Sequence, residues 1–421
     1  MVAYLLEYNR YLNLIGIAVI FGICWLLSKK RSAINLRVIL SAFALQWLIA
    51  IVALRTSVGN SVLKWLTDGV VSISAYVETG SRFLFGNLID PTQSWGFVFA
   101  FKVLPITIFF SALMAILFHY RIIQSIMIGL NFLLQPIFKT SGAETLCTIA
   151  NGFLGQTEAP LLIRHYLARM TTSEILTVMI SGMGTISGAV LIAYSEMGVP
   201  TAHLLAASAM GIPSTLLIAK ILYPETHEPE TKGKLPKEKE SAYSSIFDAI
   251  SRGTFEGLQI ALAIGAILIS FIALIAMGNG LLGVVCKTIN SVFVLFGSSW
   301  QFPICSIEML FGYLFAPFGF LLGFTGVDAI MAGQLLGIKV VANEMIAYRE
   351  MITEVMSERT MAIITYALCG FANLSSIGIQ MGGLSPLLGE KRKVIVEFGM
   401  YAVIGGTLAN LLSAMIAGLL L

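Results

Sequence analysis

Residues 151–160 read NGFLGQTEAP and place amide, hydroxyl and carboxylate groups between glycines and a proline, in a chain that is otherwise strongly apolar. The chain has 421 residues, of which 57% are hydrophobic and 12% charged. Its mean hydropathy is +0.87. A soluble globule of this composition could not cover its surface with charged groups, so we expect an all-α polytopic membrane protein.

The polar stretch predicts the tip of a re-entrant hairpin. An ionisable side chain at the bilayer centre costs about 2.5 to 3.5 kcal/mol, so Glu158 is a candidate functional residue. The alternative is that Glu158 lies in a solvated loop. Neither neighbouring arm, 143–152 or 159–168, has the roughly 20 apolar residues that a crossing needs. Irregular backbone at membrane depth is tolerated only where it lines protein or a water-filled cavity.

A second stretch has the same design. Residues 326–353 form two short apolar arms around a polar centre that contains Lys339, Asn343 and Glu344. We therefore expect a second re-entrant hairpin, with a carboxylate at its tip like the first.

Eight longer apolar runs predict membrane spans. They cover 12–27, 38–54, 97–119, 174–198, 203–222, 257–278, 359–384 and 395–420. The first run is followed, not preceded, by basic residues, so it is expected to be a spanning helix rather than a signal peptide. Residues 61–89 mix apolar and charged side chains and predict a helix in the membrane interface.

Two of these predicted spans carry small polar residues in their middle, which favours local unwinding of the helix. These residues are Ser181, Gly184, Thr185, Ser187 and Gly188 in the fourth span, and Asn373, Ser375 and Ser376 in the seventh. The fourth span is predicted to begin after a capping box, Thr171-x-x-Glu174.

The order of elements in 97–222 recurs in 257–420. Each copy has three crossings, an odd number, so the second copy enters the membrane from the opposite side. An inverted repeat with two broken helices and two hairpin tips near the midplane is typical of a secondary transporter.

The distribution of basic residues predicts the orientation. Of the 26 Lys and Arg residues, 17 fall in the predicted inner loops, seven on the outer side, and Lys102 and Lys339 at membrane depth. Because inner loops of membrane proteins are enriched in basic residues, we expect a multi-pass protein of the cytoplasmic (inner) membrane with its N-terminus outside the cytoplasm.

Other classes of function find little support in the sequence. A net charge of +3 is too small to indicate a nucleic-acid partner. The five cysteines lie in apolar stretches without a C-x-x-C pair and are expected to be packing residues. The four histidines lie near predicted span ends or in the charged loop, and no phosphate loop or hydrolase motif is present. We therefore expect no enzyme activity, no catalytic residue and no cofactor.

The polar residues near the predicted tips favour an uncharged solute rich in hydroxyl and amide groups. Candidate ligands for it are Gln156, Thr157, Glu158, Glu344, Asn373 and Ser376. A hard cation could bind oxygen atoms freed where a helix is unwound, and Asn151 and Thr185 stand beside such breaks. The alternative for Asn151 is a buried amide that bridges two helices.

Four motifs in this order resemble the bacterial branch of the concentrative nucleoside transporter family. They are GQTEAPLLIRHYL (155–167), TSEILTVMISGMGTISGAVLIAY (172–194), KVVANEMIAY (339–348) and YALCGFANLSSIGI (366–379). The resemblance covers nearly the whole chain. One departure is His165, where many relatives have proline.

The resemblance implies a homotrimer in which each chain has a scaffold and a mobile transport domain. The implied division is 1–120, N-terminal spans and interfacial helix (scaffold); 121–222, first repeat with hairpin 1 and spans 4 and 5; 223–256, charged cytoplasmic loop; 257–305, span 6 (scaffold) and connection; and 306–421, second repeat with hairpin 2 and spans 7 and 8.

The resemblance also implies roles for single residues. Gln156 and Thr157 would contact the nucleobase, with Val190 beside it and Phe371 packed on the base. The ribose hydroxyls would be held by Glu158, Glu344, Asn373 and Ser376. Sodium would be bound by side-chain oxygens of Asn151 and Thr185 and by the carbonyl groups of Leu154 and Ile186.

Together these expectations describe a symporter that imports nucleosides of the uridine, cytidine and adenosine class, driven by a sodium gradient and an elevator-type movement. The expected partners are nucleosides, sodium, membrane lipid and two further copies of the chain. A proton-coupled transporter of the same fold is the first alternative, although its branch resembles GQSEN at the tip where this chain reads GQTEA. A channel or pore for small polar solutes is the second.

Overall fold

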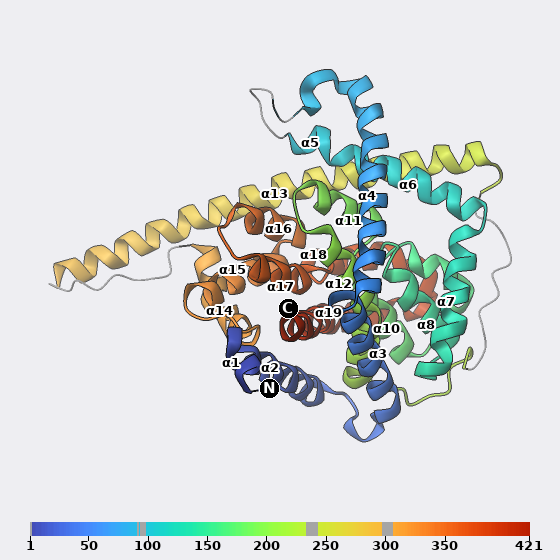
Figure 1. Cartoon of the computed structure of the whole chain (residues 1–421), viewed down its shortest axis with the longest axis horizontal. Helices are drawn as coiled ribbons and strands as arrows, with labels where there is room; N and C mark the ends of the chain where they lie inside the picture. Colours follow the sequence, from blue (N-terminus) through green and yellow to red (C-terminus); the bar gives the residue numbers. More distant parts are fainter. Residues whose placement is uncertain (1, 91, 93–97, 233–242, 297–305) are drawn as a thin grey trace.

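The computed structural model describes residues 2–90, 92, 98–232, 243–296 and 306–421. These residues form helices joined by short turns, with one isolated β-bridge between Ser141 and Lys232. Figure 1 shows the helices of the two hairpins and the broken spans gathered around α19, while α13 crosses the molecule as one long rod. The predicted all-α architecture is thus observed in the described part of the chain.

The helices of the first half begin with α1 (Val2–Leu6), α2 (Arg10–Leu27), α3 (Leu36–Arg55), α4 (Ser57–Phe85), α5 (Phe99–Lys102), α6 (Leu104–His119), α7 (Ile122–Phe138), α8 (Gly142–Asn151), α9 (Arg164–Leu167), α10 (Thr172–Met183), α11 (Gly188–Glu196) and α12 (Thr201–Leu222). The second half contains α13 (Ile246–Leu295), α14 (Ile307–Leu321), α15 (Val327–Val341), α16 (Glu344–Thr353), α17 (Glu358–Leu368), α18 (Leu374–Leu388) and α19 (Lys393–Leu420).

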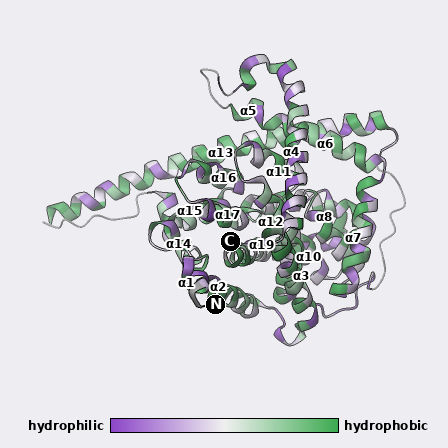
Figure 2. Cartoon of the chain, in the orientation of Figure 1, coloured by the Kyte–Doolittle hydropathy of each residue, from purple (hydrophilic) through white to green (hydrophobic). Residues whose placement is uncertain are grey.

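In the described residues, seven helical stretches are long and apolar enough to cross a membrane: Tyr4–Leu27, Leu36–Arg55, Phe99–His119, Thr172–Glu196, Thr201–Leu222, Ile246–Leu295 and Leu374–Leu420. Figure 2 shows their apolar character along most of their length. The predicted count of eight is therefore not reproduced by length and composition. The difference arises in the last two predicted spans, because one stretch, Leu374–Leu420, contains both α18 and α19 and leaves out α17, which has 11 residues.

The sixth predicted span, 257–278, is only the middle of α13, which has 50 residues. Its first turns lie in the segment predicted as loop, because the Ser245 hydroxyl caps the helix by accepting a hydrogen bond from Asp248 N. The polar residues after 278 do not end the helix, since they find partners elsewhere. Asn279 donates to both carboxylate oxygens of Glu308 at 2.9 and 3.0 Å. The connection 297–305 and the loop residues 233–242 lie outside the described residues.

One cysteine departs from its expected role. Cys24, Cys147 and Cys369 are buried and free, as packing residues should be. Cys286 in α13 is instead disulfide-bonded, so it is not only a packing residue. An apolar environment does not distinguish the two states from sequence, because it suits a free thiol and a disulfide equally.

The first two long helices pack against the core rather than standing apart from it. The buried side chain of Gln46 in α3 donates to Ser413 Oγ in α19 at 3.0 Å. At one end, Lys29 N donates to Leu222 O of α12 at 3.0 Å. At the other end, Arg10 donates to Leu421 O at 3.0 Å. These contacts anchor the ends and the middle of α2 and α3 on the core helices α12 and α19.

The helices α6 and α13 pack closely against each other. α13 crosses α6 at two glycines that leave room for backbone contact. A Cβ atom on Gly253 would lie 2.6 Å from Ala115 Cβ, and one on Gly257 would lie 2.7 Å from Ile108 Cα. Small residues four apart allow such close approach of two helices in a membrane.

Two capping boxes position the first repeat. Ser141 and Glu144 cap α8, and Thr171 and Glu174 cap α10 as predicted. Lys220 of α12 lies beside them and forms a buried ion pair with Glu144 at 2.6 Å. This pair compensates the charge of a carboxylate that would otherwise be buried alone.

Candidate functional site

Two helix breaks and two helical hairpins form the site. α10 ends at Met183, and α11 starts at Gly188 after its N-cap Ser187. α17 ends at Leu368, and α18 starts after its N-cap Asn373. Both breaks lie where the small polar residues predicted them, because side-chain hydroxyl and amide oxygens satisfy the amide groups that a new helix start leaves free.

The hairpin turns lie against these breaks. In the first hairpin α8 ends at Asn151, and a 3-10 helix follows at Ala159–Ile163. In the second, α15 and α16 pack on each other, and Asn343 caps α16 by accepting from Ile346 N at 2.9 Å. At both places the chain turns so that consecutive helical segments contact each other. That the two turns are re-entrant tips in the membrane stays a prediction.

Gln156 at the first tip reaches across to α18. Its side-chain amide donates to Ser376 Oγ at 3.4 Å. Its carbonyl oxygen accepts from Gln380 Nε2 at 3.1 Å, and the same nitrogen donates to Met179 O at 2.9 Å. All three side chains are buried. The hydrogen bonds therefore hold Gln156 in one orientation between the two repeats.

Glu344 at the second tip is fixed from two sides. Tyr194 of α11 donates its hydroxyl to Glu344 Oε1 at 2.7 Å, and Asn373 donates to Oε2 at 3.0 Å. Asn373 in turn accepts from Ser376 N at 2.9 Å. These bonds and those of Gln156 form one continuous network. It joins both tips and brings together four of the predicted substrate residues.

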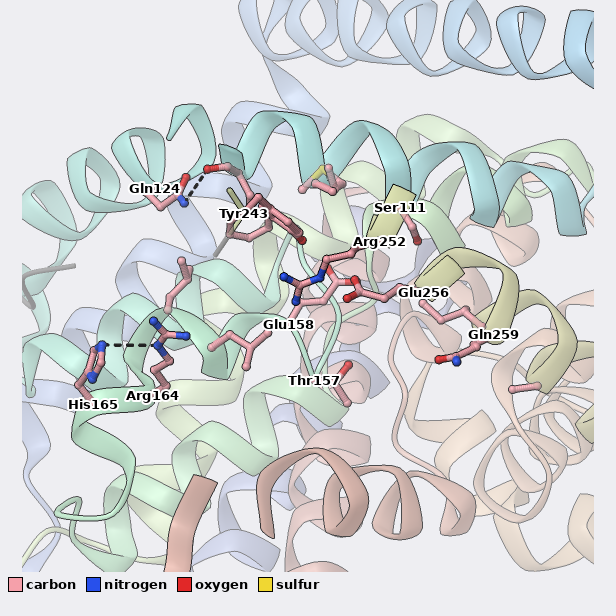
Figure 3. Close-up of a pocket in the computed structure, with 17 residues that line it drawn as sticks. Ser111, Gln124, Thr157, Glu158, Arg164, His165, Tyr243, Arg252, Glu256 and Gln259 are labelled. Carbon is pink, nitrogen blue, oxygen red and sulfur yellow. Dashed lines mark hydrogen bonds between the residues drawn. The ribbon is translucent and has the colours of Figure 1, made fainter. Parts of the chain in front are cut away.

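Glu158 and Thr157 lie elsewhere on the first tip and line a cavity of about 580 Å³. The cavity lies between the hairpin on one side and α6 and α13 on the other, and Figure 3 shows the side chains that line it. Within the described residues, the one hydrogen bond that the Glu158 carboxylate accepts comes from Gly155 N, at 3.3 Å. α13 contributes Arg252 and Glu256 to the opposite wall.

Val190, predicted to lie beside the base, and Phe371, predicted to pack on it, differ in their surroundings. Val190 is buried in the first turn of α11, where its amide group donates to Ser187 Oγ at 3.4 Å. Phe371 is half-buried in the second break, and its amide group donates to Thr185 O at 3.3 Å. Phe371 thus connects the second break to the first.

Of the four predicted sodium ligands, Asn151 and Thr185 are brought into contact where the first tip meets the first break. All four are buried. Thr185 Oγ1 donates to Asn151 O at 2.6 Å, which places the hydroxyl against the tip. The side chain of Asn151 donates to Ser181 Oγ at 2.8 Å, but its oxygen, Oδ1, is buried and has no hydrogen-bond partner among the described residues. Such an orphaned amide oxygen suits a hard cation. The roles of the Leu154 and Ile186 carbonyl groups stay predictions.

Sequence reasoning missed two residues of the network. Gln380 lies one turn after Ser376 on α18, and Tyr194 lies one turn after Val190 on α11, so each shares a helix face with a predicted residue. This one-turn spacing from a predicted residue is the sequence signal that could have identified Gln380 and Tyr194. Their partners are far away in sequence, at separations of 224 residues for Gln380 with Gln156 and 150 for Tyr194 with Glu344.

Together, apolar helices long enough to cross a membrane and a polar network at two broken helices indicate a multi-pass membrane transporter. Comparison with known proteins narrows this class. Three family models match: Na+ dependent nucleoside transporter N-terminus at residues 15–88, nucleoside recognition (Gate) at 100–201, and Na+ dependent nucleoside transporter C-terminus at 203–418.

Individual proteins match over nearly the full length. An uncharacterized transporter of Haemophilus influenzae is 40% identical over 97% of both chains. The nucleoside permease NupC of Helicobacter pylori is 39% identical over 98% of both chains. A structure of CNTnw in an inward-facing substrate-bound state has a TM-score of 0.89 and 39% identity, and the match covers 97% of this chain and 98% of that one.

The chain belongs to the concentrative, Na+-dependent nucleoside transporter family, in its bacterial NupC-like branch. The predicted resemblance is thereby confirmed. The matched relatives are transporters, in agreement with the expectation that the chain is not an enzyme.

Proposed function

We propose that the chain imports nucleosides across the cytoplasmic membrane by symport with sodium. The observation that carries this proposal is the orphaned Oδ1 of Asn151, buried beside Thr185 in the same tip that carries Gln156. A cation bound there would order the tip, and the tip presents ligands to the solute. Binding of the two would therefore be linked through one piece of backbone.

The network at the tips suits a nucleoside. Gln156 offers both a donor and an acceptor to a base edge, and Glu344, Asn373 and Ser376 offer acceptors and donors to ribose hydroxyls. Phe371 supplies an aromatic face for stacking. The names of the relatives point to the same class of solute. Uridine, cytidine and adenosine are the substrates we expect.

An elevator-type movement would carry this site across the membrane. The cavity beside Glu158 lies along the boundary between the first hairpin and the α6–α13 pair, so that boundary is the proposed sliding surface. We assign the helices up to α6, together with α13, to the scaffold. The two hairpins, α10 to α12 and α17 to α19 would move together. The scaffold would also form the homotrimer.

Two features support an N-terminus outside the cytoplasm. Disulfides persist in oxidising compartments, which favours an outer position for Cys286 near the end of α13. The cavity at the opposite end of α13 has Arg164 and Arg252 on its walls, as expected for the cytoplasmic side. In this orientation the cavity opens inward.

Uptake into liposomes tests the proposal. Purified protein should accumulate labelled uridine when sodium is high outside, and replacement of sodium by potassium should abolish the accumulation. Equal uptake in potassium would refute sodium coupling. If a protonophore abolished uptake while sodium had no effect, the protein would be proton-coupled. Uptake without saturation or accumulation against a gradient would indicate a pore.

A further inference from the structure

Two lysines are buried in the described part of the chain, and they are stabilised in different ways. Lys220 binds the Glu144 carboxylate. Lys339 of α15 is 0% exposed and takes part in none of the ion pairs that the described residues form. Its Nζ instead donates to Ala367 O at 3.0 Å and to Asn410 Oδ1 at 2.7 Å. Neutral oxygen atoms therefore hold this amine.

Asn410 of α19 extends the arrangement to both helix breaks. Its Nδ2 donates to Gly184 O at 2.8 Å and to Cys369 O at 2.7 Å. Gly184 is the C-cap of α10 and Cys369 the C-cap of α17. Carbonyl groups at such ends lack intrahelical partners and carry the negative end of the helix dipole. A positive charge placed there is stabilised by both ends.

The sequence leaves room for these contacts by placing glycine where Asn410 and α19 approach the breaks. A Cβ on Gly370 would lie 2.4 Å from Asn410 Oδ1, and one on Gly406 would lie 3.1 Å from Gly184 N. Any side chain at Gly370 would displace the oxygen that accepts from Lys339. The amine, the amide and the two breaks thus form one close-packed unit.

We propose that the ammonium group of Lys339 is a built-in cation of the second repeat. It occupies there the kind of place that the exchangeable cation occupies at Asn151 and Thr185 in the first repeat. Both places lie between a hairpin and a helix break, and both present backbone and amide oxygens. Unwound carbonyl groups and half-helix ends are the usual ligands of coupling cations in transporters.

Lys339 is on this view a positioning residue. By fixing Asn410 it fixes the second break, from which Asn373 and Ser376 reach the substrate network. Removal of its side chain should leave a dry site lined by oxygen atoms that a small cation from solution can fill. The inference rests on the proposed function only because one of its measurements is the affinity for a nucleoside.

The test compares three variants in detergent at saturating sodium. Lys339→Gly opens the site, Lys339→Met fills it without a charge, and Leu336→Gly opens a similar space at another buried position of α15. Uridine affinity and the melting temperature are measured with and without methylammonium chloride. We expect both Lys339 variants to lose roughly 10- to 100-fold in uridine affinity. Methylammonium should restore Lys339→Gly only.

Several results would overturn the inference. Wild-type uridine affinity in Lys339→Met would do so, as would equal effects of methylammonium on Lys339→Gly and Leu336→Gly. If Lys339→Gly does not fold, the yield of folded protein is measured instead of uridine affinity, from cells grown with and without methylammonium. Equal yields in the two cultures count against the inference. If the wild type binds no uridine, the proposed function fails, while the melting temperatures still decide the role of Lys339.

Discussion

Asn151→Ala tests whether cation and nucleoside are linked through the first tip. The substitution removes Oδ1, the orphaned oxygen assigned to sodium, and the hydrogen bond from Nδ2 to Ser181. A polar contact to a charged partner contributes about 1.5 to 3 kcal/mol. Sodium affinity should therefore fall roughly 10- to 100-fold.

The effect on the nucleoside follows from linkage. A coupling free energy of about 1 to 3 kcal/mol corresponds to a 5- to 150-fold change in affinity. At a sodium concentration that half-saturates the wild type, Asn151→Ala should bind uridine more weakly by a factor in this range. Because the loss lies in cation binding, high sodium should restore much of the uridine affinity.

Titration of uridine binding at several sodium concentrations, with uptake into liposomes alongside, measures both effects. Ser181→Ala is the matched control, since it removes the same hydrogen bond and leaves Asn151 Oδ1 in place. Its sodium dependence should change by less than about fivefold, the value of one ordinary hydrogen bond. Unchanged uridine affinity of Asn151→Ala at every sodium concentration would show that the two sites are not linked through the tip.

Three further predictions concern residues around the site. Gln380→Leu leaves Gln156 without its fixing donor, so uridine affinity should fall by about fivefold while sodium dependence stays the same, as a binding titration would show. Tyr194→Phe removes a hydroxyl that orients the carboxylate of the second tip and should cost about tenfold in uridine affinity; no loss would exclude that orienting role. Gly257→Leu overfills the α6–α13 contact, which should destabilise the fold by about 1 to 3 kcal/mol. The yield of folded protein on size-exclusion chromatography should therefore fall. Gly283→Leu, on the same helix, should not lower the yield, because a Cβ built at Gly283 has no described atom within 4 Å beyond its own helix backbone.

Local signals in the sequence were sufficient to predict where helices break. The capping box at Thr171 and the small polar residues near Gly184 and Asn373 act within one turn of their position, so their effect can be inferred without the rest of the chain. The length of α13 could not be predicted in this way. Asn279 looks like the end of a span, but Glu308, which satisfies it, comes from another helix.

The same reasoning separates the parts of the site. Gln156, Glu344 and Asn373 could be identified because polar groups are costly in an apolar chain. How these residues pair, and how Gln380 fixes Gln156, depends on hydrogen bonds between residues far apart in the sequence, which no local pattern encodes. The cavity beside Glu158 likewise depends on how the first hairpin packs against α13.

The two tips differ in how firmly they are held, and this difference bears on coupling. Glu344 is fixed by two hydrogen bonds and belongs to the repeat that contains Lys339. Among the described residues, the Glu158 carboxylate accepts one hydrogen bond, of 3.3 Å, and it faces the cavity. On the proposed assignment, the exchangeable cation binds at Asn151, on the tip that carries Glu158. A cation that orders part of a protein favours binding of a solute that needs the same part ordered. The second repeat, ordered by its own lysine, would then supply the rigid half of the site, and the first repeat would be the half that sodium orders.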